Sequence, residues 1–248
     1  MPERRGLKWS RLLVVLLVVA AGWFGWREFQ RQVREHPERF PWTPLSLSDP
    51  IGPFTARKLV GLTDEPARCR ALLDAVGDRD KPAPAIATGN PACGYADGMI
   101  IMAERDSSIH FTPADLVTSC PVSASLRLWE RELQSAALRH LGSRVVRIEH
   151  FGSYSCRRLY GGSEGPWSEH STADAVDIAG FRLADGRRIT VPADWVGSGD
   201  EAAFLRAARD SACELFATTL SPDYNAAHRD HLHLDQAERG ARGGRLCR

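Results

Sequence analysis

The chain has 248 residues, of which 43% are hydrophobic and 25% are charged, and its formal net charge is +1. This composition is typical of a globular protein with one large domain or two small ones. The charge is nearly balanced, and no block of lysine and arginine follows the first apolar segment. We therefore expect no nucleic-acid partner.

The first thirty residues contain a basic segment followed by an apolar one. Basic residues between positions 4 and 11 precede an uncharged run over 12–26. As a helix this run is about 22 Å long, which is short for a hydrocarbon core of roughly 30 Å. Two interpretations stay open: Ala20-Ala21-Gly22 is a signal-peptide cleavage site, or Trp23, Phe24 and Trp26 are interfacial aromatics of a signal anchor. We favour the anchor because apolar bulk continues past the small residues.

The chain divides into three expected parts. Residues 1–30 are a signal anchor or signal peptide, 31–50 are a proline-stiffened linker, and 51–248 are the folded domain. An anchor would hold the domain in the periplasm at the inner membrane, with the membrane as a partner. Cleavage would instead release a secreted protein.

The domain begins with signals for helices and loops. A helix is predicted over 64–77, with Thr63 or Asp64 as its N-cap and Pro66 in its first turn. Residues 79–98 are rich in Pro, Gly and Asn and predict a loop, and 98–102 predict a short buried strand. The strongest helical pattern covers 123–141 and ends at Gly142.

The second half of the domain mixes strands with one more helix. Alternation predicts a strand over 144–151, and a long loop follows over 152–169. Asp185-Gly186 predicts the turn of a hairpin between 175–183 and 187–191. A helix over 200–216 and a strand over 230–235 complete the pattern. This mixture predicts an α+β fold, with a small antiparallel sheet flanked by helices.

Six cysteines all follow the apolar segment. An even number in an exported chain predicts a disulfide-braced domain, for which fifteen pairings are possible. The absence of C-x-x-C spacing argues against a thiolate zinc cluster. The cysteines are Cys69, Cys93, Cys120, Cys156, Cys213 and Cys247.

Two segments carry candidate chemistry. In the strand over 230–235, His231 and His233 would point to the same face, and Asp235 could join them. Taken alone, such a pair is more often a polar strand edge than a metal site. The second segment places Asp177 among apolar residues, where a carboxylate is costly unless it is paired or coordinated, and His170 lies seven residues earlier.

Together these residues form a candidate zinc site. His170, Asp177 and His233 would supply two imidazoles and one carboxylate and leave a fourth position open, which is typical of catalytic zinc. The alternative is that Asp177 simply pairs with one of the many arginines.

These motifs resemble a known group of enzymes. His-x-x-Ala-x-Ala-x-Asp over 170–177 and Asp-His-x-His over 230–233 are similar to the zinc peptidases that cut peptidoglycan stem peptides. These are the D-Ala-D-Ala carboxypeptidases and the penicillin-insensitive murein endopeptidases, whose fold Hedgehog signalling domains share. Ala173 stands where these enzymes usually have glycine. Residues 69–247 resemble the bacterial extensin-like C-terminal domain family more closely, through Cys93-Gly94, Ser153-Tyr154-x-Cys156-Arg157, Ser168-Glu169-His170, Asp177-Ile178, Phe204-Leu205 and His231-Leu-His233-Leu-Asp235.

The resemblance implies a fold and a set of roles. The fold would be Hedgehog-like or D-Ala-D-Ala-peptidase-like, and His170, Asp177 and His233 would hold one Zn²⁺ per chain. Asp230 would be the general base that takes a proton from the zinc-bound water, and His231 would stabilise the oxyanion.

Further residues would contact the substrate. Arg157 would bind a substrate carbonyl or carboxylate, with Arg158 as the competing candidate, and His228 would face the substrate or support the ligands. Glu169 is a reserve base, and Trp167 and Tyr160 would line a groove or only pack.

Three functions remain open on these grounds. The first is an envelope zinc peptidase that hydrolyses an amide in peptidoglycan stem peptides or cross-links, with that peptide as its partner. The second is a zinc-containing module that binds cell wall or protein without cutting it. The third is a disulfide-held scaffold without metal, which would have to explain why Asp177 lies among apolar residues.

Overall fold

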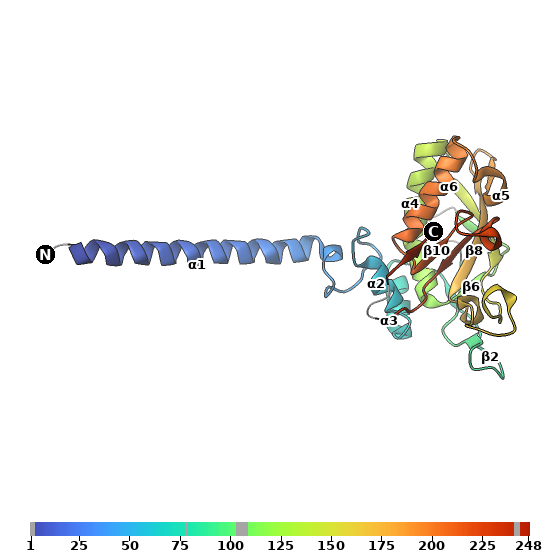
Figure 1. Cartoon of the computed structure of the whole chain (residues 1–248), viewed down its shortest axis with the longest axis horizontal. Helices are drawn as coiled ribbons and strands as arrows, with labels where there is room; N and C mark the ends of the chain where they lie inside the picture. Colours follow the sequence, from blue (N-terminus) through green and yellow to red (C-terminus); the bar gives the residue numbers. More distant parts are fainter. Residues whose placement is uncertain (1–2, 78, 103–108, 241–243) are drawn as a thin grey trace.

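The N-terminal helix projects away from the rest of the chain (Figure 1). The structure is a computed structural model that describes residues 3–77, 79–102, 109–240 and 244–248. Helix α1 spans Glu3–Glu35. Within it, Trp9–Glu35 is the one described stretch long and apolar enough to cross a membrane, with a mean hydropathy of 1.7 and no burial against the domain.

The stretch after α1 packs on the domain. The short helix η1, Pro37–Arg39, follows α1 directly. Leu45 and Leu47 are buried in the hydrophobic core. The guanidinium of Arg131 donates to the carbonyls of Leu47 and Asp49, at 2.9 Å each. Residues 45–49 are therefore held by side chains of the folded domain.

Three helices form the first half of the domain: α2, Thr55–Val60, α3, Pro66–Ala75, and α4, Cys120–Leu141. Helix α3 confirms the helix predicted over 64–77 in a shorter form, and its N-cap is Glu65 instead of Thr63 or Asp64. Helix α4 begins three residues earlier than predicted, because Ser119 caps it by accepting from the Val122 amide. It ends as predicted at Gly142, whose φ of 65° suits glycine.

The central sheet is larger than predicted and is mixed. Its order is β12-β10-β11-β8-β7-β5, with β9 paired to β8. The pairs β5–β7 and β10–β12 are parallel, and the other pairs are antiparallel. The strands are β5 His110–Thr112, β7 Val145–Gly152, β8 Ala175–Leu183, β9 Arg188–Thr190, β10 Thr218–Leu220, β11 Leu232–Asp235 and β12 Leu246–Cys247. The predicted hairpin around Asp185-Gly186 is confirmed as β8–β9.

Short elements fill the connections. The loop predicted over 79–98 contains two-residue strands, and the strand predicted over 98–102 is confirmed as β4. The elements are β1 Lys81–Pro82, β2 Ile86–Ala87, β3 Gly94–Tyr95, β4 Met99–Ile100, β6 Val117–Thr118, η2 Leu159–Gly161, η3 Glu169–Thr172, α5 Val191–Asp194 and η4 Ala226–His228.

The core lies between the sheet and the helix pair α4 and α6, where α6 spans Asp200–Cys213 (Figure 1). The helix predicted over 200–216 is thus confirmed with an earlier end. The Trp129 indole donates to the Ala208 carbonyl at 2.9 Å, and the Phe181 ring lies 5.1 Å from that of Phe204. Alternate residues of β8 and β11 enter this core and are fully buried: Val176, Ile178, Leu232 and Leu234.

Three disulfides brace the domain, and they pair all six cysteines. One joins α3 to the start of α4, one ties the β2–β3 region to the loop after β7, and one ties the end of α6 to β12. The pairs are Cys69–Cys120, Cys93–Cys156 and Cys213–Cys247. The disulfides and the mixture of helices and sheets confirm a disulfide-braced α+β fold.

Candidate metal centre

The sheet places two of the three predicted ligands opposite each other. In the antiparallel pairing of β8 with β11, His233 is the direct partner of Asp177. Because side chains alternate along a strand, the apolar neighbours of both residues enter the core while Asp177 and His233 point to the other face. Residues directly opposite have Cβ atoms about 4.5–5.5 Å apart, which is close enough for both side chains to reach one ion.

The third predicted ligand comes from the turn before β8. His170 lies in η3, whose N-cap Ser168 accepts from the His170 amide at 3.4 Å. The turn ends at Ala173 with φ of 59°, a left-handed conformation that favours glycine. This is the position where the peptidases that the motif resembles usually carry glycine. The reversal at Ala173 carries the chain into β8 and brings His170 next to Asp177.

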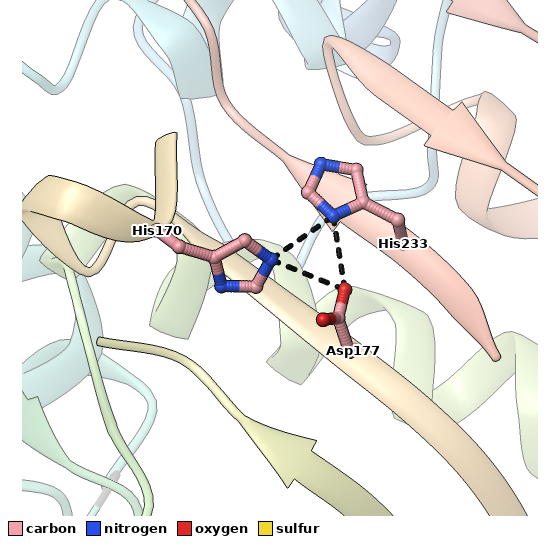
Figure 2. Close-up of side chains that lie close together, drawn as sticks. All are labelled: His170, Asp177 and His233. Atoms are coloured by element: carbon pink, nitrogen blue, oxygen red, sulfur yellow. Dashed lines mark hydrogen bonds and ion pairs between the residues drawn. The ribbon is translucent and has the colours of Figure 1, made fainter. Parts of the chain in front are cut away.

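The three side chains converge on one point (Figure 2). His170 Nε2 lies 3.2 Å from Asp177 Oδ1 and 3.2 Å from His233 Nδ1, and His233 Nδ1 lies 2.9 Å from Asp177 Oδ1. Zinc bonds of about 2.0–2.1 Å in a tetrahedron separate the ligand atoms by about 3.3–3.4 Å. The three atoms thus already stand close to the spacing that one such ion requires, and this group could hold a metal ion.

The outer nitrogens of both imidazoles face hydrogen-bond acceptors. His170 Nδ1 lies 2.5 Å from the Ser153 carbonyl, and His233 Nε2 lies 2.9 Å from Asp235 Oδ2. A carbonyl or an ionised carboxylate can only accept, so both outer nitrogens carry protons. In the neutral imidazoles the inner nitrogens then present lone pairs to the centre. Such outer partners are the usual support of metal-bound histidine.

The carboxylates favour positive charge at the centre. Burial alone would raise the pKa of Asp177, but hydrogen bonding to the His170 and His233 imidazoles outweighs it and holds that pKa below its usual value. Burial would likewise lower the pKa of His233, but hydrogen bonds to Asp177 and Asp235 raise it to about 9. A proton therefore stays here at neutral pH unless a metal ion replaces it, and metal binding would release that proton.

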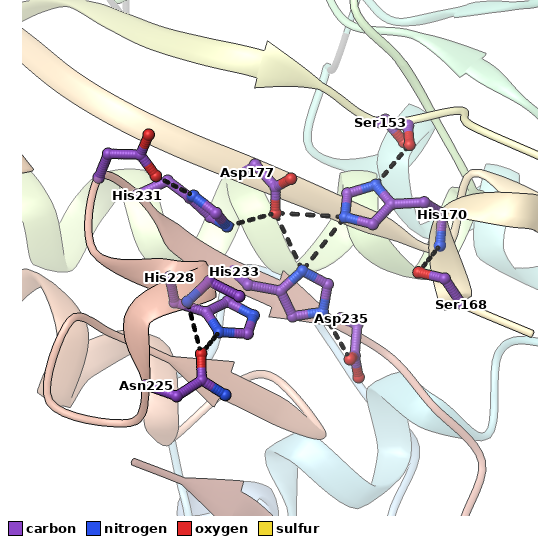
Figure 3. A network of polar contacts seen from close by, with 11 residues as sticks. Ser153, Ser168, His170, Asp177, Asn225, His228, His231, His233 and Asp235 are labelled. Atoms are coloured by element: carbon purple, nitrogen blue, oxygen red, sulfur yellow. Dashed lines mark hydrogen bonds and ion pairs between the residues drawn. The ribbon is translucent and has the colours of Figure 1, made fainter. Parts of the chain in front are cut away.

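A second histidine pair flanks the centre (Figure 3). His231 Nε2 lies 3.5 Å from Asp177 Oδ1, and its Nδ1 lies 2.9 Å from Asp230 Oδ1. The Asp230 side chain is 41% exposed and contacts Nδ1 of His231, whereas Asp177 lies nearer to Nε2 of the same ring. The His228 ring lies 5.2 Å from that of His231, and its Nδ1 lies 2.8 Å from Asn225 Oδ1. Burial and then the neighbouring imidazoles lower the pKa of His228 to about 4.

An open cavity of about 660 Å³ adjoins the centre. Arg157 lines it, whereas the Arg158 guanidinium donates to the Gly165 carbonyl and stacks on Trp167, 4.4 Å from the ring centroid. The rest of the predicted set also lines the cavity, apart from Asp230. These residues are Tyr160, Trp167, Glu169, His170, Asp177, His228, His231 and His233. Burial, followed by the charge of Asp235, raises the pKa of Glu169.

Some supporting groups could not be read from the sequence. The sequence indicates Asp235 as a possible member of the cluster, because it follows the period of the strand. The Ser153 carbonyl and the Asn225 side chain were missed. A main-chain acceptor leaves no trace in the residue type, and Asn225 is separated from its partner by a turn.

The comparisons with known proteins place this domain in a family. The family described as extensin-like protein C-terminus matches residues 67–248. The chain belongs to this family. The matched range contains the candidate metal centre and all three disulfides, and it begins after α2. The comparison with curated proteins gave no significant match. The apolar helix α1 and the disulfides together indicate an extracytoplasmic protein.

Proposed function

We propose that this protein is a zinc peptidase of the bacterial envelope that hydrolyses an amide bond in peptidoglycan stem peptides or cross-links. The observation that carries the proposal is the convergence of three donor atoms at 2.9–3.2 Å beside an open cavity. The motif resemblance supports both the substrate class and a fold related to the D-Ala-D-Ala peptidases and Hedgehog domains. In this account α1 is retained as a membrane anchor.

His170, Asp177 and His233 would hold the ion. Zinc in this position supplies Lewis-acid polarisation of the scissile carbonyl and a nucleophile made from water at neutral pH. The donor set fits, because two neutral imidazoles and one carboxylate leave a net positive centre with an open side facing the cavity. Asp235 and the Ser153 carbonyl fix the two imidazoles in the required tautomers.

The contacts favour His231 as the group that moves the proton. Asp230 accepts from His231 Nδ1, and in that tautomer His231 Nε2 is the ring nitrogen on the side of the candidate metal centre. His231 Nε2 can then take a proton from the attacking water and return it to the leaving amine, while Asp230 orients the ring. This division of roles differs from the motif-based assignment of Asp230 as the base, which stays a prediction.

Two further residues would act on the substrate. Arg157 lines the cavity, and among the described residues its guanidinium has no hydrogen-bond or ion-pair partner. It is therefore available to bind a peptide carboxylate or carbonyl. Arg158 is already engaged with Gly165 and Trp167 and is the matched control for it. His228 is held by Asn225 at the wall of the cavity and would contact the bound peptide.

The test uses the full-length protein loaded with zinc and incubated with purified muropeptides. Mass spectrometry should detect new peptide termini, and His170→Ala should lose both zinc and cleavage. His231→Ala should keep zinc, and its turnover should fall by ~10²–10⁴-fold, which is the usual contribution of proton transfer. Nearly full turnover in His231→Ala together with a large loss in Asp230→Asn would return the role of base to Asp230. Zinc retained without cleavage of any muropeptide would contradict the peptidase and favour a binding module.

A further inference from the structure

An aromatic cluster joins the end of α1 to the segment that follows it. The Phe29 ring lies 5.8 Å from Phe40 and 6.5 Å from Trp42, and Phe40 lies 5.3 Å from Trp42. The Trp26 ring lies 5.8 Å from Phe29 on the same helix. We call Phe29, Phe40 and Trp42 the aromatic collar. One of its members, Trp42, is 65% exposed, although large aromatic rings normally avoid water.

If α1 spans the membrane, the collar lies at the level of the lipid headgroups. This premise rests on the function proposed above, in which α1 is a membrane anchor. Phe29 follows Trp26 by three residues, or about 4.5 Å along a helix. The headgroup layer on each side of the bilayer is about 5–7 Å thick. The uncharged run over 12–26 is about 22 Å long and shorter than the core, so hydrophobic mismatch draws the following residues toward the bilayer.

The collar is firmly attached to the catalytic domain. Lys58 on α2 donates to Thr43 Oγ1 at 3.0 Å and to the Pro37 carbonyl at 3.4 Å. Leu45 and Leu47 then enter the domain core, a few residues after Trp42. A collar that lies in the headgroup layer would therefore hold the whole domain against the membrane.

The surface beside the collar is basic. A groove of about 490 Å³ is lined by Trp42 and by the cations Arg57, Lys58 and Arg68, with Glu65 as its only acid among the described residues. Glu65 pairs with Arg68 at 2.8 Å, so the groove keeps an excess of positive charge. The Arg39 side chain next to Phe40 is 58% exposed, although its Nε lies 3.6 Å from the carboxylate of the buried Glu38. Cations next to an interfacial tryptophan complement the phosphates of an anionic lipid surface.

We propose that the aromatic collar and its basic groove form a second membrane contact, which docks the domain on the periplasmic face of a bilayer that contains anionic phospholipid. Trp42 enters the headgroup layer, and Arg57 of the groove binds lipid phosphate together with the exposed Arg39 next to Phe40. The domain is then fixed at the membrane surface, in contrast to a domain on a flexible tether.

The test places single nitroxide labels on the full-length protein in nanodiscs of phosphatidylethanolamine and phosphatidylglycerol. The labelled variants are Pro41→Cys, which leaves Trp42 in place, Val196→Cys in an exposed loop, and Leu16→Cys within the membrane helix. Accessibility to a water-soluble nickel relaxant is measured for each. The label at position 41 should be several-fold less accessible than the label at 196, and adding Trp42→Ser should raise its accessibility.

Two results would overturn the docking in different ways. A label at 41 as accessible as the one at 196, with the label at 16 shielded, means that the helix is inserted but the collar is in water. A label at 16 that is also accessible means that the anchor itself is absent, so that part of the proposed function fails as well. Zinc content, measured on the same samples, reports on the metal centre separately.

Discussion

The candidate metal centre combines two regions that are held in place by different means. Asp177, His233 and Asp235 belong to the sheet and are positioned by the pairing of β8 with β11. His170, Arg157 and the Ser153 carbonyl belong to the loop between β7 and β8, which is held by a turn cap and the disulfide Cys93–Cys156. The sheet region is fixed by many cooperative hydrogen bonds, whereas the loop region depends on a few individual contacts. Removing one group should therefore have different consequences in the two regions.

The largest effect is expected for Asp177→Asn in the sheet region. The amide keeps the shape of the side chain but removes the only negative charge among the three ligands, so the chain should no longer hold zinc after dialysis. Elemental analysis against the unmodified protein measures this. Asp185→Asn, in the exposed β8–β9 turn, is the matched control and should keep one zinc per chain. Zinc retained in Asp177→Asn would show that this carboxylate is not a ligand.

In the loop region, we expect a large loss of stability with retention of metal. Replacing Cys93 and Cys156 together by serine should lower the free energy of unfolding by about 2–4 kcal/mol. Urea denaturation under non-reducing conditions measures the change. Zinc stoichiometry should be unchanged, because the Ser168 cap and the Ser153 carbonyl still hold the turn that carries His170. Loss of zinc together with the disulfide would show that His170 depends on Cys93–Cys156 for its position, which would contradict this prediction.

Asp235→Asn sharpens the comparison within the sheet region. The amide can still accept from His233 Nε2, but it is neutral and can also turn its own donor toward the ring. Partners of this kind usually change metal affinity by about 10- to 100-fold. Competition with a chromophoric chelator should show such a decrease, with zinc still bound at saturation. An unchanged affinity would mean that Asp235 does not support His233.

The smallest effect is expected for Asp174→Asn, at the junction of the two regions. Asp174 is buried and accepts a hydrogen bond from Ser119, and burial raises its pKa well above 3.8. The folded state therefore binds this proton more tightly than the unfolded state, and stability falls as the pH rises from about 4 toward neutral. The asparagine variant should lose less stability over this range. Urea denaturation at several pH values tests this, and identical slopes would contradict the raised pKa.

The sequence was most informative where a period repeats. The stripe of α4 was predicted because many residues report the same pattern, and the β8–β9 hairpin was predicted from the turn signal Asp185-Gly186. The common face of His231 and His233 was likewise expected from the alternation of a strand. The position of Asp177 among apolar residues indicated that its carboxylate is paired or coordinated.

Other features leave no local pattern. Strand β5 has three residues and β12 has two, so neither gives a period, and the parallel edges of the sheet were missed. The disulfide pairing depends on distances through space, and the roles of Arg157 and Arg158 depend on which guanidinium already has partners. The packing of Leu45 and Leu47 into the core was hidden in a stretch that proline content made look like a linker.

The central claim is that two imidazoles and one carboxylate close around a single divalent ion. Zinc X-ray absorption spectroscopy of the full-length, zinc-loaded protein tests it most directly. The account predicts one zinc per chain with four nitrogen and oxygen neighbours at about 2.0–2.1 Å and the multiple-scattering signal of two imidazoles. His233→Ala should remove one imidazole from that signal or remove the zinc altogether. Sulfur neighbours, a shell without imidazole, or a spectrum unchanged by His233→Ala would contradict it.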